Sequence, residues 1–215
     1  MNVYVITHPT PEDIKGIIDL HDDDIVIGVD QAILAIHKQH IKIDLAVGDF
    51  DSLADPTLLD GLKTVRLESV KDVTDTHQAL LEAMRFKPDE LYLIGGIGGE
   101  RIEHFFAHIL LFDLFPTLIM QHEHSTIFML EEGTWTLSSD GYVSVFAYPE
   151  ASLSLKGFKY ELNDYHLKTY DPLGISNEIT SQEGIITIHK GRVLVIMSDG
   201  EPSTVLTGHH HSRSR

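Results

Sequence analysis

Cysteine is absent from this chain of 215 residues. Its absence excludes disulfide bonds and thiolate zinc sites, and it fits a cytoplasmic location. Long apolar runs are also missing, so no segment is predicted to span a membrane. The first residues lack the basic start, the apolar stretch and the small-residue cleavage site of a secretory signal, and we therefore expect none.

Positive charge is scarce. The sequence holds 16 lysines and arginines against 33 aspartates and glutamates, which gives a formal net charge of −17. A surface this acidic repels phosphate backbones, so we expect no nucleic acid partner. A nucleotide substrate would need a metal ion and a few well-placed cations to overcome the overall field.

Hydrophobic residues make up 42% of the chain, which is enough for one large domain or two small ones. We predict an α/β domain over residues 1–120 and a β-sandwich domain over residues 121–205. Residues 206–215 form a histidine- and arginine-rich tail that we exclude from the fold.

The first half of the sequence alternates between strand-like and helix-like segments. Short apolar runs predict strands at residues 3–6, 25–27, 45–47 and 91–94. Apolar residues at helical spacing predict one helix that begins at Thr10 and further helices at residues 31–39, 75–86 and 103–115. This alternation is typical of a mostly parallel sheet with flanking helices.

The second half contains strand-like runs and no long helical pattern. The predicted strands cover residues 125–130, 134–137, 142–146, 152–155, 185–189 and 193–197. Turn signals such as Asp140-Gly141 and Lys190-Gly191 separate them. The pattern is typical of a β-sandwich.

Two carboxylates follow the third predicted strand directly, in the segment Gly48-Asp49-Phe50-Asp51-Ser52. If the chain stays extended, Asp49 and Asp51 point to the same side, because side chains alternate along a strand. Neighbouring carboxylates repel each other unless a cation lies between them, and Mg²⁺ binds one or two carboxylates together with substrate phosphates. A solvated acidic turn explains the same residues about equally well.

A second polar segment, Lys71-Asp72-Val73-Thr74-Asp75, precedes a predicted helix. Thr74 or Asp75 can cap this helix, whose first N–H groups can bind an anion. Lys71 would add a positive charge beside the anion, and Asp75 could supply a third carboxylate to a metal ion. The alternative is plain capping with Lys71 on the surface, and for Thr74 capping is the better interpretation.

A glycine-rich segment at residues 95–99 follows another predicted strand and leads into a helix. Its glycines would let the backbone approach a phosphate closely. Arg101 is the natural phosphate-binding side chain here, because its guanidinium carries a fixed fork of donors. The spacing is not that of a P-loop, and a flexible turn with Arg101 in a surface ion pair is the alternative.

These three segments would meet at one rim, because the carboxyl ends of parallel strands face the same edge of a sheet. Several carboxylates, one lysine, one arginine and glycine-rich backbone suit magnesium-dependent phosphoryl transfer. His104 and His108 lie one helical turn apart, but the glutamate of H-E-x-x-H is missing, so we do not predict a zinc site.

The ordered set of motifs resembles the thiamine pyrophosphokinase family. The family's G-D-F-D-S and K-D-x-T-D motifs stand at residues 48–52 and 71–75. Residues 28–32 are similar to its V-D-G-G-A, and Ser176-Asn177 matches a late S-N. The departures are Gln31 and Glu100 in place of glycines, and Glu103 in place of an aspartate.

The resemblance implies a homodimer that transfers a diphosphate from Mg-ATP to the hydroxyl of thiamine. The α/β domain would bind ATP, and the β-sandwich would help to bind thiamine. It implies that Asp49, Asp51 and Asp75 hold Mg²⁺. It also implies a set of polar side chains that contact the nucleotide: Asp30, Lys71, Asp72, Thr74, Arg101, Glu103 and His104. Ser176 and Asn177 would contact thiamine, a role that rests wholly on the resemblance.

We expect the thiamine hydroxyl to attack the β-phosphorus of ATP in line, with AMP as the leaving group. Asp51 or Asp72 would accept or orient the hydroxyl proton, and Arg101 would stabilise phosphate charge, so these three are the predicted catalytic residues. Two alternatives stay open. One is another magnesium-dependent phosphotransferase for a small hydroxyl substrate. The other is a non-catalytic nucleotide-binding relative, which Glu100 and Glu103 favour.

Overall fold

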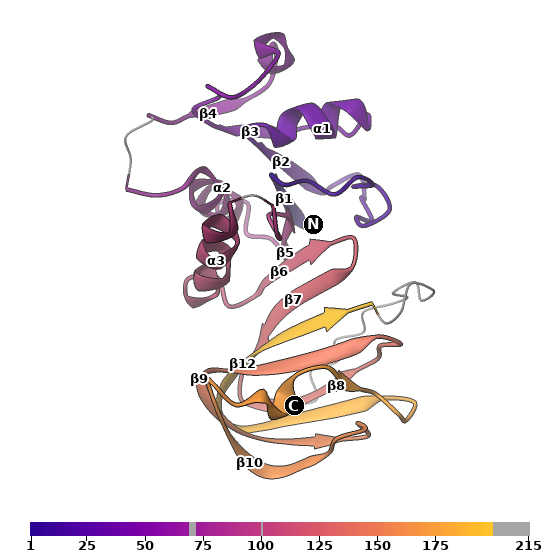
Figure 1. Ribbon diagram of the computed structural model, residues 1–215. Helices are drawn as coiled ribbons and strands as arrows, with labels where there is room; N and C mark the ends of the chain where they lie inside the picture. The colour runs from indigo at the N-terminus through magenta and orange to yellow at the C-terminus, as the bar shows by residue number, and fades with distance from the viewer. Residues whose placement is uncertain (69–71, 100, 200–215) are drawn as a thin grey trace. The chain divides into compact units, whose positions relative to one another are not determined.

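The computed structural model describes residues 1–68, 72–99 and 101–199. The chain forms two compact units, Met1–Glu123 and a second unit that begins at His124 (Figure 1). The first unit holds a parallel sheet with helices, and the second is built of strands, so the predicted fold class is confirmed. No helix within the described part is both long and apolar enough to cross a membrane.

The sheet of the first unit has the strand order β6-β5-β1-β2-β3-β4, and each neighbouring pair is parallel. Its strands are β1 (Val3–Thr7), β2 (Ile25–Val29), β3 (Leu45–Gly48), β4 (Thr64–Arg66), β5 (Leu91–Gly95) and β6 (Leu118–His122). The four predicted strands are confirmed, whereas β4 and β6 were not predicted. The central strands are buried nearly throughout, as a sheet covered on both faces requires.

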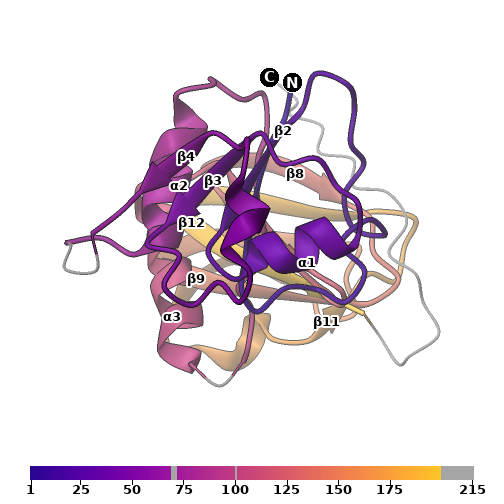
Figure 2. The ribbon, with the colours of Figure 1, turned by 90° about the horizontal axis from the view of Figure 1, so that it is seen from above.

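Helices cover both faces of this sheet. They are α1 (Ala32–Lys38), α2 (Asp75–Met84) and α3 (Ile102–Leu110), with short 3₁₀ turns η1 (Pro56–Leu59) and η2 (Leu111–Asp113). Ile36 of α1 packs in one cluster with Tyr4 and Ile6, while Thr76 of α2 hydrogen-bonds Thr7. Because side chains alternate along β1, these contacts lie on opposite faces. Figure 2 shows α1 on one side of the strands and α2 and α3 on the other.

The helix predicted to begin at Thr10 does not form. The chain makes a single turn instead, in which Ile18 N donates to the carbonyl of Ile14 at 3.1 Å. Ile14 N donates to Gln39 Oε1 at 2.9 Å, so a side chain from beyond α1 satisfies backbone that a helix would satisfy internally. Ile14 and Ile18 are buried all the same. The apolar spacing therefore predicts burial correctly and helix wrongly.

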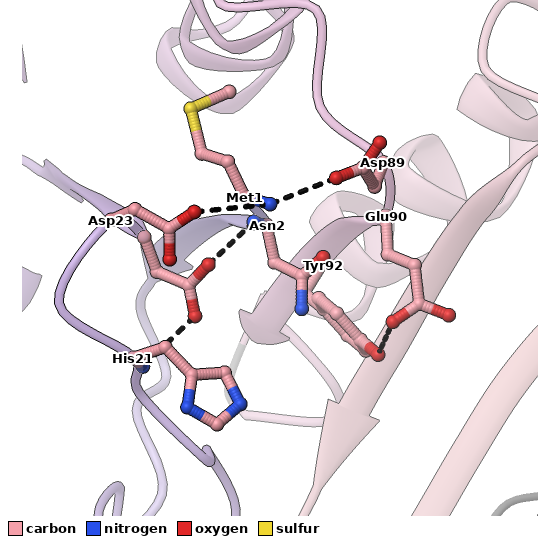
Figure 3. Close-up of polar contacts among 8 residues, drawn as sticks. Met1, Asn2, His21, Asp23, Asp89, Glu90 and Tyr92 are labelled. Atoms are coloured by element: carbon pink, nitrogen blue, oxygen red, sulfur yellow. Dashed lines mark hydrogen bonds and ion pairs between the residues drawn. The ribbon is translucent and has the colours of Figure 1, made fainter.

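Polar contacts hold the amino end of the sheet together (Figure 3). The α-amino group of Met1 lies 2.8 Å from Asp89 Oδ2 and 3.5 Å from Asp23 Oδ2. Asn2 N donates to Asp24 Oδ1 at 2.5 Å. The hydrogen bond to Asp89 raises the pKa of the α-amino group. Acidic residues thus hold the amino-terminal end of β1 in place.

The second unit is antiparallel. It contains β7 (Ser125–Leu130), β8 (Gly133–Leu137), β9 (Tyr142–Lys156), β10 (Leu162–Lys168), β11 (Asn177–Glu178), β12 (Gly184–Ser198) and the 3₁₀ turn η3 (Pro172–Gly174). The long strand β12 pairs with β9 over most of its length. Its first half also pairs with β8 and its second half with β7. One strand therefore joins the two ends of this unit.

Two pairs of predicted strands are in fact single long strands. Residues 142–146 and 152–155 both belong to β9, and residues 185–189 and 193–197 both belong to β12. The turn predicted at Lys190-Gly191 is a bulge, because the register against β9 shifts on both sides of it. Gly191 has φ +84°, and a Cβ there would lie 2.4 Å from the carbonyl oxygen of Glu150. A glycine inside a strand pattern marks a bulge as readily as a turn.

Candidate functional site

The carboxyl ends of the central strands are level with one another. Thr7 at the end of β1 pairs with Gly95 at the end of β5, and Val29 of β2 pairs with Val47 of β3. Strands β2, β3 and β4 follow one another on one side of β1, whereas β5 and β6 lie on the other side of β1. Such a reversal of strand order is where open α/β sheets bind ligands.

A pocket of about 410 Å³ lies at this rim. It is lined by residues that follow β1, β2, β3 and β5 and by the first turn of α2. Five of the residues predicted to bind the nucleotide or metal line it: Asp30, Thr74, Asp75, Arg101 and His104. Gly98 and Gly99 of the glycine-rich segment also line it. The rim predicted from the strand ends is therefore a real cavity.

The position of Asp30 explains the glycine that opens the G-D-F-D-S motif. Asp30 Oδ1 accepts a hydrogen bond from Phe50 N at 3.2 Å, which ties the loop after β2 to the loop after β3. A Cβ at Gly48 would lie only 1.8 Å from that same oxygen. Gly48 is thus required by the close approach of the Asp30 carboxylate.

The two carboxylates of the G-D-F-D-S motif do not have the extended backbone that their predicted pairing requires. Phe50 between them has φ +61°, a left-handed conformation that is rare for an aromatic residue. Its ring is buried, with the Arg66 guanidinium carbon 5.2 Å from the ring centroid. Asp49 Oδ1 accepts a hydrogen bond from Asp51 N at 3.2 Å. Ser52 lines the pocket, whereas Asp49 and Asp51 are not among its lining residues.

The start of α2 is held in place at the pocket by two threonines. Thr74 is the N-cap, and its Oγ1 accepts from His77 N at 3.1 Å, which confirms the predicted capping role. Thr76 Oγ1 lies 2.9 Å from Thr7 Oγ1 in a buried hydrogen bond between α2 and β1. Asp75, the first residue of the helix, is directed to the pocket as a result.

Arg101 is paired with the acidic residue that departs from the family pattern. Its Nε donates to Glu103 Oε1 at 3.2 Å, and both side chains are largely exposed. A backbone hydrogen bond at the start of α3, and then this contact with Arg101, lower the pKa of Glu103. Glu103 is thus a charged partner of Arg101, and a phosphate at the pocket would compete with it for the guanidinium.

His108 supports the glycine-rich segment from beneath, a role that the sequence did not reveal. It is buried, and its Nδ1 lies 3.1 Å from the carbonyl oxygen of Gly96. Burial lowers the pKa of His108, so the ring is neutral and donates its Nδ1 proton to that carbonyl. A Cβ at Gly96 would lie 2.7 Å from the ring. The only signal in the sequence was the one-turn spacing of His104 and His108.

The remaining predicted residues lie elsewhere. Asp72 is exposed just before α2, and Lys71 and Glu100 fall outside the described residues. Ser176 and Asn177 belong to the second unit. The amide of Asn177 is buried and bonds both backbone groups of Tyr160, with Oδ1 accepting at 3.0 Å and Nδ2 donating at 2.8 Å. Ser176 is exposed beside it, with φ +52°.

Asp49, Asp51 and Asp75 were predicted to hold a metal ion together. Within the described ranges, no three histidine, aspartate or glutamate side chains are grouped so that they could hold a metal ion by themselves. Asp49, Asp51 and Asp75 therefore do not form a preassembled trio. Two carboxylates, those of Asp30 and Asp75, do line the same pocket.

Family models match most of the chain in two parts. The model described as "Thiamin pyrophosphokinase, catalytic domain" matches residues 20–123. The model described as "Thiamin pyrophosphokinase, vitamin B1 binding domain" matches residues 129–193. The pocket, apart from Thr7, His8 and Pro9 at the end of β1 and just after it, lies in the part matched by the catalytic-domain model.

Individual relatives agree with these models. The thiamine pyrophosphokinase of Bacillus subtilis is 32% identical over 201 residues, which cover 86% of this chain and 92% of that protein. A crystal structure of thiamine pyrophosphokinase from the same species superposes with a TM-score of 0.83 at 26% identity, covering 93% of this chain and 99% of that one. The Candida albicans thiamin pyrophosphokinase, at 17% identity, shares the fold with a TM-score of 0.68 over 92% of this chain and 89% of its own.

Proposed function

The chain belongs to the thiamine pyrophosphokinase family, and from this premise we propose that the pocket at the ends of β1, β2 and β5 binds the triphosphate of Mg-ATP. The reaction is ATP-dependent transfer of a diphosphate to the hydroxyl of thiamine, which yields thiamine diphosphate and AMP. One observation carries the proposal: Asp30, Asp75 and Arg101 line a single cavity together with glycine backbone.

Three kinds of donor would bind the phosphates. The first N–H groups of α2 point out of the start of that helix, where an anion is stabilised. Arg101 would exchange its exposed contact with Glu103 for a phosphate oxygen, and a bidentate phosphate contact is stronger than a solvated ion pair. Gly98 and Gly99 let the phosphates come close to the backbone. Lys71 and His104 stay predicted contacts of the same phosphates.

Mg²⁺ fits the donors of this pocket. It takes one or two carboxylates and completes its shell with waters and substrate phosphates, so Asp30 and Asp75 suffice without a third protein ligand. Asp49 and Asp51, on the adjoining loop, stay predicted ligands. When bound, the ion neutralises negative charge that develops on the phosphate oxygens.

The attacking hydroxyl needs a group that accepts or orients its proton. Asp51 and Asp72 are exposed carboxylates near the rim of the sheet, and we propose one of them for this role. Thr74 and Glu103 would act on the nucleotide indirectly, Thr74 through α2 and Glu103 through Arg101. Thiamine would be bound by the second unit, where Ser176 is exposed and Asn177 fixes the backbone around it.

A homodimer is supported by an apolar stripe on the first unit. Ile102, Phe106, Leu110 and Leu114 stand at steps of four residues and are 61%, 63%, 49% and 60% exposed. A row of exposed large apolar side chains such as this one is typical of an interaction surface. A second copy of this chain is the partner that we propose for it. We also propose a cytoplasmic location, which the use of ATP and the lack of cysteine support.

The proposal is tested by removing one charge at a time. We expect Asp75→Asn and Asp51→Asn to lower AMP formation from ATP, Mg²⁺ and thiamine by about 100-fold or more while the fold is retained. Asp60→Asn, an exposed carboxylate outside the pocket, is the matched control. Near-normal turnover in Asp75→Asn would remove this pocket from the reaction, and near-normal turnover in Asp51→Asn would remove Asp51 alone.

A further inference from the structure

Glycines make up most of the segment that follows β5 at the pocket, so almost no side chain of its own restrains its backbone. Gly95, Gly96, Gly98 and Gly99 have positive φ values of +85°, +68°, +73° and +84°. Glycine adopts such conformations without strain, but it loses more conformational freedom than any other residue when it is fixed. If phosphates had to fix this segment as they bound, their affinity would fall by that entropic cost.

Hydrogen bonds on both sides of Gly96 already restrain the segment. Gly96 N donates to the carbonyl of Pro9 at 2.9 Å, and the carbonyl of Gly96 accepts from His108 Nδ1 at 3.1 Å. The second bond fixes the peptide group that joins Gly96 to Ile97. Because a trans peptide group is planar with its C=O and N–H opposed, the N–H of Ile97 points away from the buried ring. His108 thus orients the backbone that leads into the pocket-lining part of the segment.

The ring of His108 is itself held in one orientation. It is 2% exposed, and a Cβ at Gly96 would lie 2.7 Å from Nδ1, so ring and backbone are in close contact. A carbonyl oxygen can only accept, so the proton of the neutral ring is on Nδ1. His104 lies in the first turn of α3, Arg101 directly precedes this helix, and both line the pocket. His108 therefore ties the glycine-rich segment to the helix that presents these two side chains.

We propose that His108 is a positioning residue for phosphate binding, which holds the glycine-rich segment in its binding conformation before the nucleotide arrives. It does not line the pocket and acts through the carbonyl of Gly96. The inference rests on the proposed function, because it gives His108 a share in the affinity of that phosphate site. A buried histidine that only filled space in the core would stabilise the fold and leave this affinity unchanged, so the two roles differ in a measurable way.

The test compares two variants of His108 with a control. His108→Leu removes the donor, whereas His108→Asn keeps one, because the amide nitrogen of asparagine stands as many bonds from Cβ as Nδ1 does. Val3→Ala removes buried methyl groups at the amino end of β1, away from the pocket, and is the control for a general loss of stability. Magnesium tripolyphosphate, which consists of phosphates alone, is titrated calorimetrically into each full-length protein. Urea unfolding gives the stability, and AMP formation gives the KM for ATP and for thiamine.

We expect His108→Leu to bind tripolyphosphate about tenfold more weakly and to raise the KM for ATP by a similar factor, because the phosphates must then order the segment themselves. The KM for thiamine should not change. His108→Asn should restore both phosphate-dependent values to within about twofold of the wild type. Val3→Ala should lower stability and keep the wild-type affinity.

Wild-type affinity for tripolyphosphate in His108→Leu would overturn the inference and leave the proposed function standing. An equal loss in His108→Asn or in Val3→Ala would also overturn it, because the donated hydrogen bond would then not be the cause. If the wild type bound neither tripolyphosphate nor ATP, the phosphate site and the inference would both be wrong. Should His108→Leu fail to fold, Gly96→Ala tests the same bond from the other side, since its Cβ would press on the ring, and wild-type affinity there would contradict the inference equally.

Discussion

Gly48 has no side chain, and this leaves room for the carboxylate of Asp30. We expect Gly48→Ala to displace the Asp30 carboxylate, because the new Cβ would lie 1.8 Å from its Oδ1. AMP formation should fall at least about tenfold, since Asp30 is a proposed ligand of the magnesium ion. Steady-state turnover with ATP and thiamine measures the effect.

Gly61 offers a matched control for this substitution. Both glycines have positive φ, +153° at Gly48 and +80° at Gly61, but a Cβ at Gly61 would meet no atom within 4 Å. Gly61→Ala should therefore cost about 1 kcal/mol of unfolding free energy from backbone strain and leave turnover unchanged. Equal turnover in the two variants would show that Asp30 is not needed where it stands.

Because His108 is buried, we expect the unfolding free energy of the protein to depend on pH. Burial, with a smaller contribution from the charge of His104, holds the pKa of His108 below its ordinary value. As the pH falls, His108 therefore becomes protonated at a higher pH in the unfolded chain than in the folded chain. The stability that neutral His108 contributes is complete above about pH 6.5 and is lost as the pH falls through the lower pKa of the folded state.

We therefore expect His108→Asn, which can still donate to the carbonyl of Gly96, to flatten the fall in unfolding free energy between about pH 7 and pH 5. Urea unfolding at several pH values measures the slope. His37→Asn, at an exposed histidine of α1, should keep the wild-type slope. An unchanged slope in His108→Asn would mean that the buried ring does not titrate in this range.

At the scale of elements, the position of α2 depends on its first turn. Thr74→Ala removes the side chain that accepts from His77 N, and we expect a loss of about 1 kcal/mol of unfolding free energy. ATP affinity should fall as well, because Thr74, Asp75 and Thr76 all line the pocket. Thr74→Ser keeps the cap and should restore both. A loss of stability without a loss of ATP affinity would separate the capping role from the site.

The strands of the parallel sheet were predictable because each central strand is a short apolar run bounded by turn residues. The edge strand β4 was not, since its three residues carry exposed side chains at Thr64 and Arg66 and owe their conformation to pairing with β3. In β12, the local signal at Lys190-Gly191 could not distinguish a turn from a bulge. Strand pairing between distant segments decides such cases, and it leaves no mark in the local sequence.

The candidate site was predictable to a similar degree. Thr74, Asp75 and Arg101 were placed at one rim because each follows a strand or begins a helix, and the pocket brings them together. The pairing of Asp49 with Asp51 assumed an extended chain, and the left-handed φ of Phe50 removes that assumption. The support that His108 gives to Gly96 joins residues 12 positions apart and depends on how α3 packs.

At the scale of the whole molecule, the net charge of −17 has structural uses beyond the site. Asp24 accepts a hydrogen bond from the backbone of Asn2, just before β1, Asp44 accepts one from the backbone of β2, and Asp13 caps the turn at Gly16. Part of the acidity therefore holds loops in place, and in the proposed function Arg101 and Mg²⁺ would offset the overall negative field locally at the pocket.

The homodimer that we propose depends on the apolar stripe formed by Ile102, Phe106, Leu110 and Leu114. Phe106 lies at its centre, between Ile102 and Leu110, and is 63% exposed. Phe106→Glu would place a charge in the middle of an apolar contact, where it would remain unpaired in both copies of a symmetric interface. We expect this variant to sediment as a monomer at concentrations at which the wild type is a dimer.

Leu20→Glu is the control for this last experiment. Leu20 is also an exposed large apolar residue of the first unit, but it lies outside the α3 stripe. It should leave the sedimentation coefficient unchanged, since a scattered apolar residue on a surface marks no interface. If Phe106→Glu stayed dimeric, the copies would have to meet through another surface. If both variants and the wild type were monomers, the stripe would have to bind something other than this chain.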